Sequence, residues 1–304
     1  MLTVNVPSPG SLRLLIVDGH AYAYRAFHAI RHLNAPDGTP TNAIYGFVKM
    51  LAKMRAFIAP THTVVIWDGG LAAERTTAHP DYKAQRPPMP ESLAGQLDGI
   101  GEYLRAAGIA SWCRDGVEAD DWIAAAARRA ATAGTRVVIA SSDKDFMQLV
   151  SPEVGLLNPN DKAERIWTEA EVVAKAGVRP GQIVDWLSLV GDSVDNIRGV
   201  PGVGPKTATD LLRQFGSVSA LYQRLGEVAS ERIRQSLDGA TAAVRRNLDL
   251  IRLRDDLVGD FDLADTAPGT EAVGDLLALF QRWGFRSLRA ELEARRSPAQ
   301  GELL

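Results

Sequence analysis

Short runs of aliphatic and β-branched residues alternate with stretches of helical periodicity along the first half of the chain. Three of these runs predict buried parallel strands, because a strand covered on both faces is apolar at successive positions rather than at alternate ones. The runs span residues 12–17, 62–67 and 136–140. Helical stretches separate or follow them at residues 20–32, 41–58, 91–107 and 122–133. This alternation predicts an α/β fold with a parallel sheet.

Acidic residues follow each predicted strand. Asp18 ends the first, Asp68 follows the second, and Asp143 and Asp145 follow the third. A further acidic run precedes the helical stretch at 122–133 and contains Glu118, Asp120 and Asp121. One Asp at the start of a helix is usually an N-cap. Carboxylates gathered at one sheet edge repel each other by roughly 4 kcal/mol per pair at about 4 Å, so we expect hard divalent cations such as Mg²⁺ or Mn²⁺ among them.

A segment rich in proline, polar and basic residues lies at residues 74–90. Its low apolar content predicts an exposed, mobile segment. Where it is helical, Arg75, Tyr82 and Arg86 fall near one face, with Lys83 beside them. One interpretation is a solvated loop with unrelated charges. The other is a cationic segment that supplies charge to a phosphate substrate without filling the metal site. Composition alone leaves both open.

A second informative block spans residues 191–208 and contains a glycine-rich turn before a helix predicted from about Pro205. The backbone N–H groups of the turn, with Lys206, are suited to hold a phosphate oxygen at the helix N-terminus. Many helix pairs are joined by such turns, so the turn alone is weak evidence. Asp192 and Asp195 directly precede it and add two acids that could reach the metal site.

Composition narrows the class of protein. At 304 residues, with 46% hydrophobic and 23% charged residues, the chain can bury a full core. A net charge of −3 argues against a uniformly basic nucleic-acid binder, although an acidic metal site can offset a basic surface elsewhere. Cys113 is the one cysteine, which favours a reducing compartment. The sequence shows no signal-peptide pattern and no apolar run of membrane-spanning length, so we expect a cytoplasmic protein without a membrane partner.

Taken together, these blocks resemble the 5′-nuclease family, which includes flap endonucleases and the 5′→3′ exonuclease domain of bacterial DNA polymerase I. The matching pieces run in family order over most of the chain, at residues 17–19, 24–28, 68–69, 82–90, 116–121, 142–148 and 191–208. The segment after Val273 is similar to the end of that domain. No polymerase sequence follows residue 304, so we expect a stand-alone nuclease.

The resemblance implies an α/β fold with a PIN-like (Rossmann-like) parallel sheet core, a helical arch over the active site and a helix–three-turn–helix region that binds duplex DNA. The expected domains are a flexible N-terminal tail at 1–11, the nuclease core at 12–190 with the arch at 69–108, the duplex-binding region at 191–257 and a C-terminal helical segment at 258–304 that packs on the core.

The resemblance also implies roles for individual residues. One divalent metal ion would be held by Asp18, Asp68, Glu118 and Asp120. The second would be held or surrounded by Asp143, Asp145, Asp192 and Asp195, with Asp121 as a further participant. The catalytic groups around the scissile phosphate would be Arg75, Lys83 and Arg86 of the arch, and Tyr24, which stacks on a nucleotide. DNA would be bound by Arg25, Arg198, Gly202, Gly204, Lys206 and Thr207, and the hairpin holds a monovalent ion such as K⁺ in some relatives.

The implied activity is two-metal hydrolysis of a phosphodiester, in which one ion activates water and the other neutralises the leaving oxygen. The expected partner is DNA with a 5′ end or a 5′ flap, with RNA primer–DNA hybrids among the substrates. We expect a monomer, associated with the nucleoid through DNA during replication and repair. A PIN-type ribonuclease would share the acidic sheet edge but lack the arch and the hairpin. A non-catalytic DNA-binding scaffold would show gaps among the acids, whereas every expected position carries one.

Overall fold

The computed structural model describes residues 12–163, 165–257 and 261–296, so the tail expected at residues 1–11 lies outside the described residues. The described chain divides into two compact units. Unit 1 comprises residues 68–88 and 113–257, and unit 2 comprises residues 12–67, 89–112 and 261–296. Three candidate site residues, Asp18, Tyr24 and Arg25, belong to unit 2, and the others belong to unit 1.

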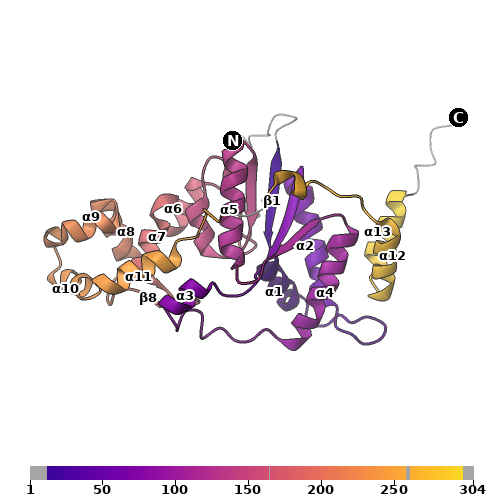
Figure 1. Ribbon diagram of the computed structural model, residues 1–304, viewed down its shortest axis with the longest axis horizontal. Coiled ribbons are helices and arrows are strands. Elements are labelled where there is room, and N and C mark those ends of the chain that lie inside the picture. Colours follow the sequence, from indigo (N-terminus) through magenta and orange to yellow (C-terminus); the bar gives the residue numbers. More distant parts are fainter. Residues whose placement is uncertain (1–11, 164, 258–260, 297–304) are drawn as a thin grey trace. The chain divides into compact units, whose positions relative to one another are not determined.

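Unit 2 is built on parallel strands β1 (Arg13–Asp18) and β2 (His62–Trp67), with β3 (Ala110–Cys113) next to β2. The register pairs Leu14 with His62 and Asp18 with Ile66. The middle of β1 is fully buried, as the apolar run predicted. The α-helices of this unit, labelled in Figure 1, are α1 (Gly19–Ala29), α2 (Asn42–Ile58), α4 (Glu91–Ala106), α12 (Val273–Arg282) and α13 (Arg286–Arg296). The short 3₁₀ helix η4 (Leu263–Thr266) precedes α12.

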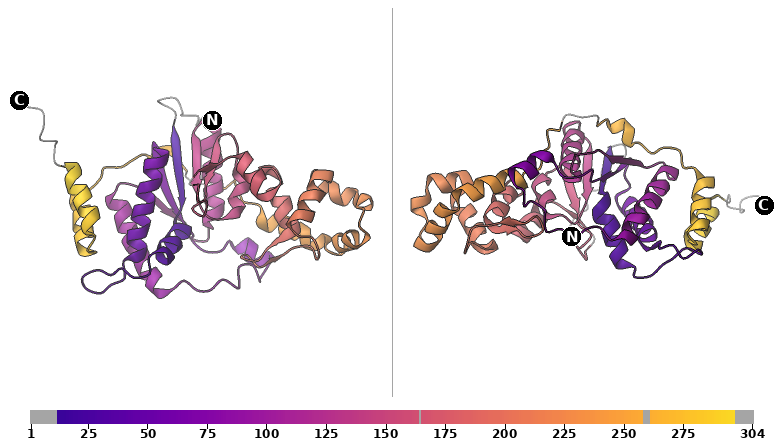
Figure 2. Two further views of the ribbon diagram at one scale, coloured as in Figure 1. Left: turned by 180° about the vertical axis from the view of Figure 1, so that it is seen from behind. Right: turned by 60° about the horizontal axis from the view of Figure 1, so that its bottom comes forward.

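Unit 1 contains strand β4 (Arg136–Ala140), which pairs in parallel with β5 (Val154–Leu157); β6 (Ile166–Trp167) is antiparallel to β5. Its elements before the glycine-rich turn are α3 (Ala73–Ala78), α5 (Ala119–Thr132), η1 (Lys144–Leu149), α6 (Glu169–Ala176), η2 (Pro180–Gln182) and α7 (Ile183–Val190). After the turn come α8 (Pro205–Phe215), α9 (Val218–Gln223), η3 (Leu225–Glu227), α10 (Glu231–Gly239) and α11 (Thr241–Ile251). Figures 1 and 2 show α8 to α11 gathered as one helical group.

A short antiparallel ribbon connects these two parts of unit 1. It consists of β7 (Gly191–Asp192) and β8 (Ile197–Arg198). Gly191 has φ of +87°, and a Cβ on Gly199 would lie 2.3 Å from the carbonyl carbon of Val190, so both positions require glycine. The side-chain amide of Asn247 donates to the backbone carbonyls of Ser188, at 3.0 Å, and Arg198, at 2.8 Å. These contacts connect α11 to α7 and to β8.

The fold confirms the main expectations from the sequence. The strands at 62–67 and 136–140 have the predicted bounds, and the chain is an α/β protein with mostly parallel strands. Thr168 and Glu171 form a capping box at the start of α6, and Gly284 separates α12 from α13. The glycine-rich turn is preceded by η2, which leads directly into α7. Residues 69–88 group with unit 1 and residues 89–108 with unit 2, and the expected domain boundaries stay predictions. No helix in the described part of the chain is long and apolar enough to cross a membrane.

Candidate active site

Three aspartates of unit 1 form a compact group that we call the acidic triad: Asp145, Asp192 and Asp195. Asp145 lies in η1 just after β4, Asp192 ends β7, and Asp195 lies in the turn before β8. One carboxylate oxygen from each lies within 4.8 Å of the others. The exposed fractions of the three residues are 8%, 6% and 6%. The structure therefore brings together acids that are about 50 residues apart in the sequence.

Local hydrogen bonds orient two members of the triad. Oδ1 of Asp143 caps η1 by accepting the N–H of Asp145 at 2.8 Å, and the N–H of Asp143 donates to Oγ of Ser141 at 3.1 Å. Oδ1 of Asp192 accepts the N–H of Val194 at 3.0 Å. Asp143 is therefore the N-cap that fixes the backbone at the start of η1, where Asp145 lies.

The triad carries a negative charge that its surroundings do not fully satisfy. Burial raises the pKa of Asp145 well above its usual range, and the carboxylates of Asp143, Asp192 and Asp195 raise it further. Burial also raises the pKa of Asp143. Oδ1 of Asp145 is buried and has no hydrogen-bond partner among the described residues. An unsatisfied buried carboxylate oxygen beside two other carboxylates fits the oxygen ligand set of a divalent metal ion.

Two cations of the chain touch the other two triad members. Nζ of Lys144 lies 2.6 Å from Oδ2 of Asp192, and Nη2 of Arg86 lies 2.6 Å from Oδ1 of Asp195. Burial opposes the charge on Lys144, but Asp192 outweighs this effect and raises the pKa of the ammonium. Sequence reasoning did not select Lys144. The position of this lysine between Asp143 and Asp145 in the sequence could have identified it as a counter-ion of the acidic residues.

A second set of carboxylates, Glu118, Asp120 and Asp121, lies at the start of α5 and is called here the neutralised group. Glu118 has an exposed fraction of 0%. Its Oε1 accepts from Nη1 of Arg75 at 3.0 Å and from the N–H of Ala72 at 3.3 Å. Its Oε2 accepts from Nζ of Lys83 at 2.5 Å and from the hydroxyl of Tyr82 at 3.4 Å. Both oxygens of Glu118 therefore have donors from the chain itself.

The other two members of the neutralised group share the same cations. Oδ1 of Asp121 accepts from Nη2 of Arg75 at 2.8 Å and from the N–H of Arg254 at 2.9 Å. Nη2 of Arg75 also donates to the carbonyl of Arg252 at 3.2 Å. Nζ of Lys83 lies 3.5 Å from Oδ2 of Asp120. Arg75 thereby connects α3, the start of α5 and the residues after α11.

The charges in this network stabilise one another. Burial opposes the charge on Lys83, but Asp120, Tyr82 and Glu118 outweigh it and raise the pKa of the ammonium. Burial also opposes the charge on Arg75, whose pKa Asp121 and Glu118 raise. Burial disfavours the Glu118 carboxylate, yet Lys83 and Arg75 lower its pKa below the usual value. All three groups are therefore ionised in the folded protein.

The prediction that the segment at 74–90 is exposed is wrong at three positions. Arg75, Tyr82 and Lys83 have exposed fractions of 7%, 4% and 5%. The helix α3 ends at Ala78, and turns follow it. The N–H of Lys83 donates to the carbonyl of Asp195 at 3.2 Å. Charged side chains are buried here because carboxylates more than 30 residues away supply the counter-charge.

The remaining candidate metal ligands lie in different units. Asp68 belongs to unit 1, where its Oδ1 accepts the N–H of Gly70 at 2.8 Å. Asp18 belongs to unit 2 and caps α1 by accepting the N–H of Ala21 at 3.0 Å. Tyr24 and Arg25 lie on α1 of unit 2, and the roles expected of both residues stay predictions.

The predicted DNA-binding turn leads into α8 with Pro205 at its first position. Gly202 has φ of +79°, a conformation that favours glycine. Lys206 is exposed and has no ion-pair partner among the residues that the structure describes. Arg198, Gly204 and Thr207 lie in the same short stretch, between β8 and the first turn of α8.

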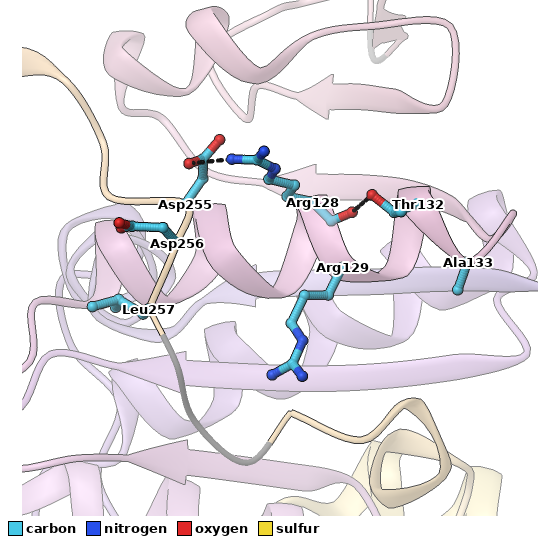
Figure 3. Close-up of a pocket in the computed structure, with 7 residues that line it drawn as sticks. All are labelled: Arg128, Arg129, Thr132, Ala133, Asp255, Asp256 and Leu257. Atoms are coloured by element: carbon cyan, nitrogen blue, oxygen red, sulfur yellow. Dashed lines mark hydrogen bonds and ion pairs between the residues drawn. The ribbon is translucent and has the colours of Figure 1, made fainter.

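A surface hollow in unit 1, drawn in Figure 3, is a different feature. It is lined by Arg128, Arg129, Thr132, Ala133, Asp255, Asp256 and Leu257. Nη1 of Arg128 pairs with Oδ1 of Asp255 at 2.7 Å. The lining residues of α5 come from its C-terminal half, whereas the carboxylates of the neutralised group lie at its start. The hollow holds no member of either carboxylate set.

Comparison with known proteins places this geometry in a family. Residues 13–177 match the family described as the 5′-3′ exonuclease N-terminal resolvase-like domain, and residues 178–273 match the 5′-3′ exonuclease C-terminal SAM fold. A 5′-3′ exonuclease of Aquifex aeolicus is 43% identical over 210 residues, which cover 69% of this chain and 72% of that protein. DNA polymerase I of Bacillus caldotenax is 38% identical over 284 residues, which cover 93% of this chain and 32% of the polymerase. The chain thus spans about a third of that polymerase.

Solved structures show the same fold. The D15 flap endonuclease of bacteriophage T5, in a complex with DNA and metal ions, has a TM-score of 0.66 at 22% identity, covering 93% of this chain and 99% of that one. The catalytic core of Rad2 in complex with DNA substrate has a TM-score of 0.65 at 14% identity, covering 94% and 92%. With a family match over more than half of its length and a relative above 40% identity, the chain belongs to the 5′-3′ exonuclease family of nucleases.

Proposed function

We propose that this member of the 5′-3′ exonuclease family hydrolyses phosphodiesters at or near the 5′ end of DNA, both as a 5′→3′ exonuclease and as a 5′-flap endonuclease. The observation that carries the proposal is the acidic triad, in which a buried oxygen of Asp145 has no partner among the described residues. A buried carboxylate oxygen with a purely structural role would accept a hydrogen bond or pair with a cation of the chain. A carboxylate oxygen that serves as a metal ligand needs neither of these partners.

The metal ions in this proposal are Mg²⁺ or Mn²⁺, because all candidate ligands are carboxylate oxygens. One ion is held by Asp18, Asp68, Glu118 and Asp120, and the second is held or surrounded by Asp143, Asp145, Asp192 and Asp195. When bound, such ions activate a water molecule and neutralise charge on the leaving oxygen. The N-cap hydrogen bond from the N–H of Asp145 to Oδ1 of Asp143 supports this arrangement, because it fixes the backbone beside both carboxylates.

The basic segment supplies charge to the scissile phosphate in this proposal. The groups concerned are Arg75, Lys83 and Arg86, and Tyr24 stacks on the nucleotide at the cleavage site. Arg86 supports this role because 40% of its side chain is exposed, so its guanidinium can exchange Asp195 for a phosphate. Lys83 has 2% of its side chain exposed and must first leave Glu118.

The duplex is held by the turn before α8. Lys206 supports this part of the proposal, since an exposed cation that has no ion pair within the described part of the chain is available to a phosphate. Arg198, Gly202, Gly204 and Thr207 complete the turn, with K⁺ as its monovalent ion, and Arg25 contacts the DNA elsewhere. The protein acts as a monomer in the cytoplasm, on nucleoid DNA and on RNA primer–DNA hybrids, in replication and repair.

The test is a comparison of cleavage on three substrates: a 5′-flap duplex, a duplex with a recessed 5′ end and a linear single strand. We expect cleavage of both duplexes in Mg²⁺ or Mn²⁺, with mononucleotide release from the recessed end, and no cleavage in EDTA. Efficient cleavage of single-stranded RNA with no action on either duplex would instead favour a PIN-type ribonuclease. Binding without cleavage in any divalent metal would favour a DNA-binding scaffold.

A further inference from the structure

Two cations hold the same carboxylate of Glu118, and they hold it through different oxygens. Arg75 donates to Oε1, and Lys83 donates to Oε2. Both cations are buried, and both come from the segment that the sequence predicted to be solvated. Their further contacts differ, and this difference suggests that they have different tasks.

Arg75 is committed to several parts of unit 1 at once. Besides Glu118, its guanidinium donates to Oδ1 of Asp121 and to the backbone carbonyl of Arg252. Asp121 in turn accepts the N–H of Arg254. A planar guanidinium that is shared among three acceptors is fixed in direction, and moving it would leave buried acceptors without donors. Arg75 is therefore poorly placed to leave its site for a phosphate.

Lys83 has simpler contacts. Its ammonium lies 2.5 Å from Oε2 of Glu118, 3.5 Å from Oδ2 of Asp120 and 5.0 Å from the centre of the Tyr82 ring. It occupies a point between two carboxylate oxygens, which is where a divalent ion shared by these residues would also lie. A compact ammonium is a point charge, and another point charge can replace it without changing the direction of the carboxylates.

The backbone of Lys83 also differs from that of its neighbours. Its φ of +56° lies in the left-handed region, which is unfavourable for a residue with a Cβ. Such a conformation persists where surrounding contacts impose it, and it is released when they are lost. The hydrogen bond from its N–H to the carbonyl of Asp195 is one such contact.

We propose that Arg75 is a positioning residue and that Lys83 is an exchangeable counter-ion for the same carboxylate. Arg75 holds Oε1 of Glu118 and Oδ1 of Asp121 both in the metal-free protein and in the metal-bound protein. Oε2 of Glu118 therefore remains beside Asp120. The ammonium of Lys83 occupies the place of a divalent ion between Glu118 and Asp120, and the ion displaces it. This inference rests on the proposed function, because it takes Glu118 and Asp120 as ligands. It removes Arg75 from the groups that touch DNA and Asp121 from the ligands.

Metal binding without DNA separates this proposal from a general charge effect. Removal of any nearby cation makes the site more negative, so a charge effect alone predicts tighter metal binding in both variants. The proposal predicts opposite signs: removal of Lys83 eliminates a competitor, whereas removal of Arg75 releases the carboxylate that the metal requires. The probe is Mn²⁺ alone, titrated into the full chain by calorimetry, in an Asp145→Asn background that weakens the acidic triad.

We expect Lys83→Met to bind Mn²⁺ roughly three- to tenfold more tightly and Arg75→Gln to bind it more weakly by a similar factor, as for contacting residues that couple directly. Arg75→Lys should not restore the affinity, because one ammonium cannot serve three acceptors. The matched control is Lys175→Met, which removes an exposed lysine of α6 and should leave the affinity unchanged.

Further variants keep the test decisive if Arg75→Gln does not fold. Asp121→Asn retains the Arg75–Glu118 contact but loosens the guanidinium, and it should weaken Mn²⁺ binding in the same direction. In a Glu118→Gln background, Lys83→Met should no longer tighten binding.

Tighter binding in both Lys83→Met and Asp121→Asn, or no change in Lys83→Met, would overturn the inference. A wild type that cleaves the 5′ flap with Mn²⁺ while these results hold would leave the proposed function intact. A wild type that binds no Mn²⁺ would overturn both.

Discussion

The acidic triad and the neutralised group both lie where a strand or loop of unit 1 meets a helix or a tight turn, and both contain buried aspartates or glutamates. In the neutralised group, both oxygens of Glu118 receive donors from Arg75, Lys83 and their neighbours. In the triad, Lys144 and Arg86 touch two members, but one oxygen of Asp145 remains buried without a partner among the described residues.

This difference shows that clustered carboxylates alone do not identify a metal site. A cluster that carries its own cations is stable without metal, because the desolvation of each ion is offset by a close opposite charge. A cluster with an unpaired buried oxygen stores repulsion that a divalent ion can relieve. Substitutions in the two groups should therefore change stability in opposite directions.

The largest expected effect on stability is that of Glu118→Gln. It leaves the buried side chains of Arg75 and Lys83 without their shared counter-charge, and breaking a buried pair in this way costs about 3–5 kcal/mol. The measurement is the free energy of unfolding in urea, without metal. Glu169→Gln is the control, because Glu169 is exposed at the start of α6, and it should be nearly neutral. A loss below about 1 kcal/mol in Glu118→Gln would show that the network is not held by this charge.

Asp145→Asn should have the opposite effect on the metal-free protein, with a large effect on activity. Removing one charge from the triad relieves repulsion, so the free energy of unfolding should equal or exceed that of the wild type. Cleavage of a 5′-flap duplex under single-turnover conditions should fall by about 100- to 1,000-fold, as expected when one preorganised charge-stabilising group is removed. Asp238→Asn, in α10, is the exposed control. Turnover near that of the wild type would contradict the assignment of the triad.

Divalent ions should stabilise the folded wild type. Because they bind the folded state, the gain is about 2.7 kcal/mol at a free concentration 100 times the dissociation constant. The gain should be smaller in Asp145→Asn but not zero, because Glu118 and Asp120 still bind an ion that displaces Lys83. Thermal unfolding with Mg²⁺, with Mn²⁺ and with EDTA measures the effect. An equal metal-induced shift in the wild type and in Asp145→Asn would mean that the metal binds outside the triad.

The smallest effect on stability is expected for Lys206, an exposed cation with no ion-pair partner among the described residues. Lys206→Ala should change the free energy of unfolding by no more than about 0.5 kcal/mol, since the side chain is exposed. It should weaken duplex binding and reduce the salt dependence by about one phosphate contact, with cleavage at saturating DNA nearly unchanged. Fluorescence anisotropy over a range of KCl concentrations tests this. An unaltered slope would make the turn a simple helix connector.

The burial of Lys83 is a feature that could not be predicted from the sequence. Its position in a polar, proline-flanked segment predicted a side chain whose removal would cost little stability. The structure buries it against Glu118, which lies 35 residues further along the chain. Burial of a lysine depends on its counter-charge. Local composition therefore could not predict it.

The position of an acid at the end of β1, after β2 and after β4 could be predicted from the sequence, because buried parallel strands have apolar runs with recognisable ends. Local rules also account for the capping box at Thr168 and for the end of α12 before Gly284. Tertiary structure decided which carboxylates are paired with cations of the chain and which are not. Asp145 and Glu118 have the same chemistry in the sequence, and they differ because Arg75 and Lys83 fold onto one of them and not onto the other. This pairing depends on contacts between segments that are distant in the sequence, and hydrophobic periodicity carries no information about such contacts.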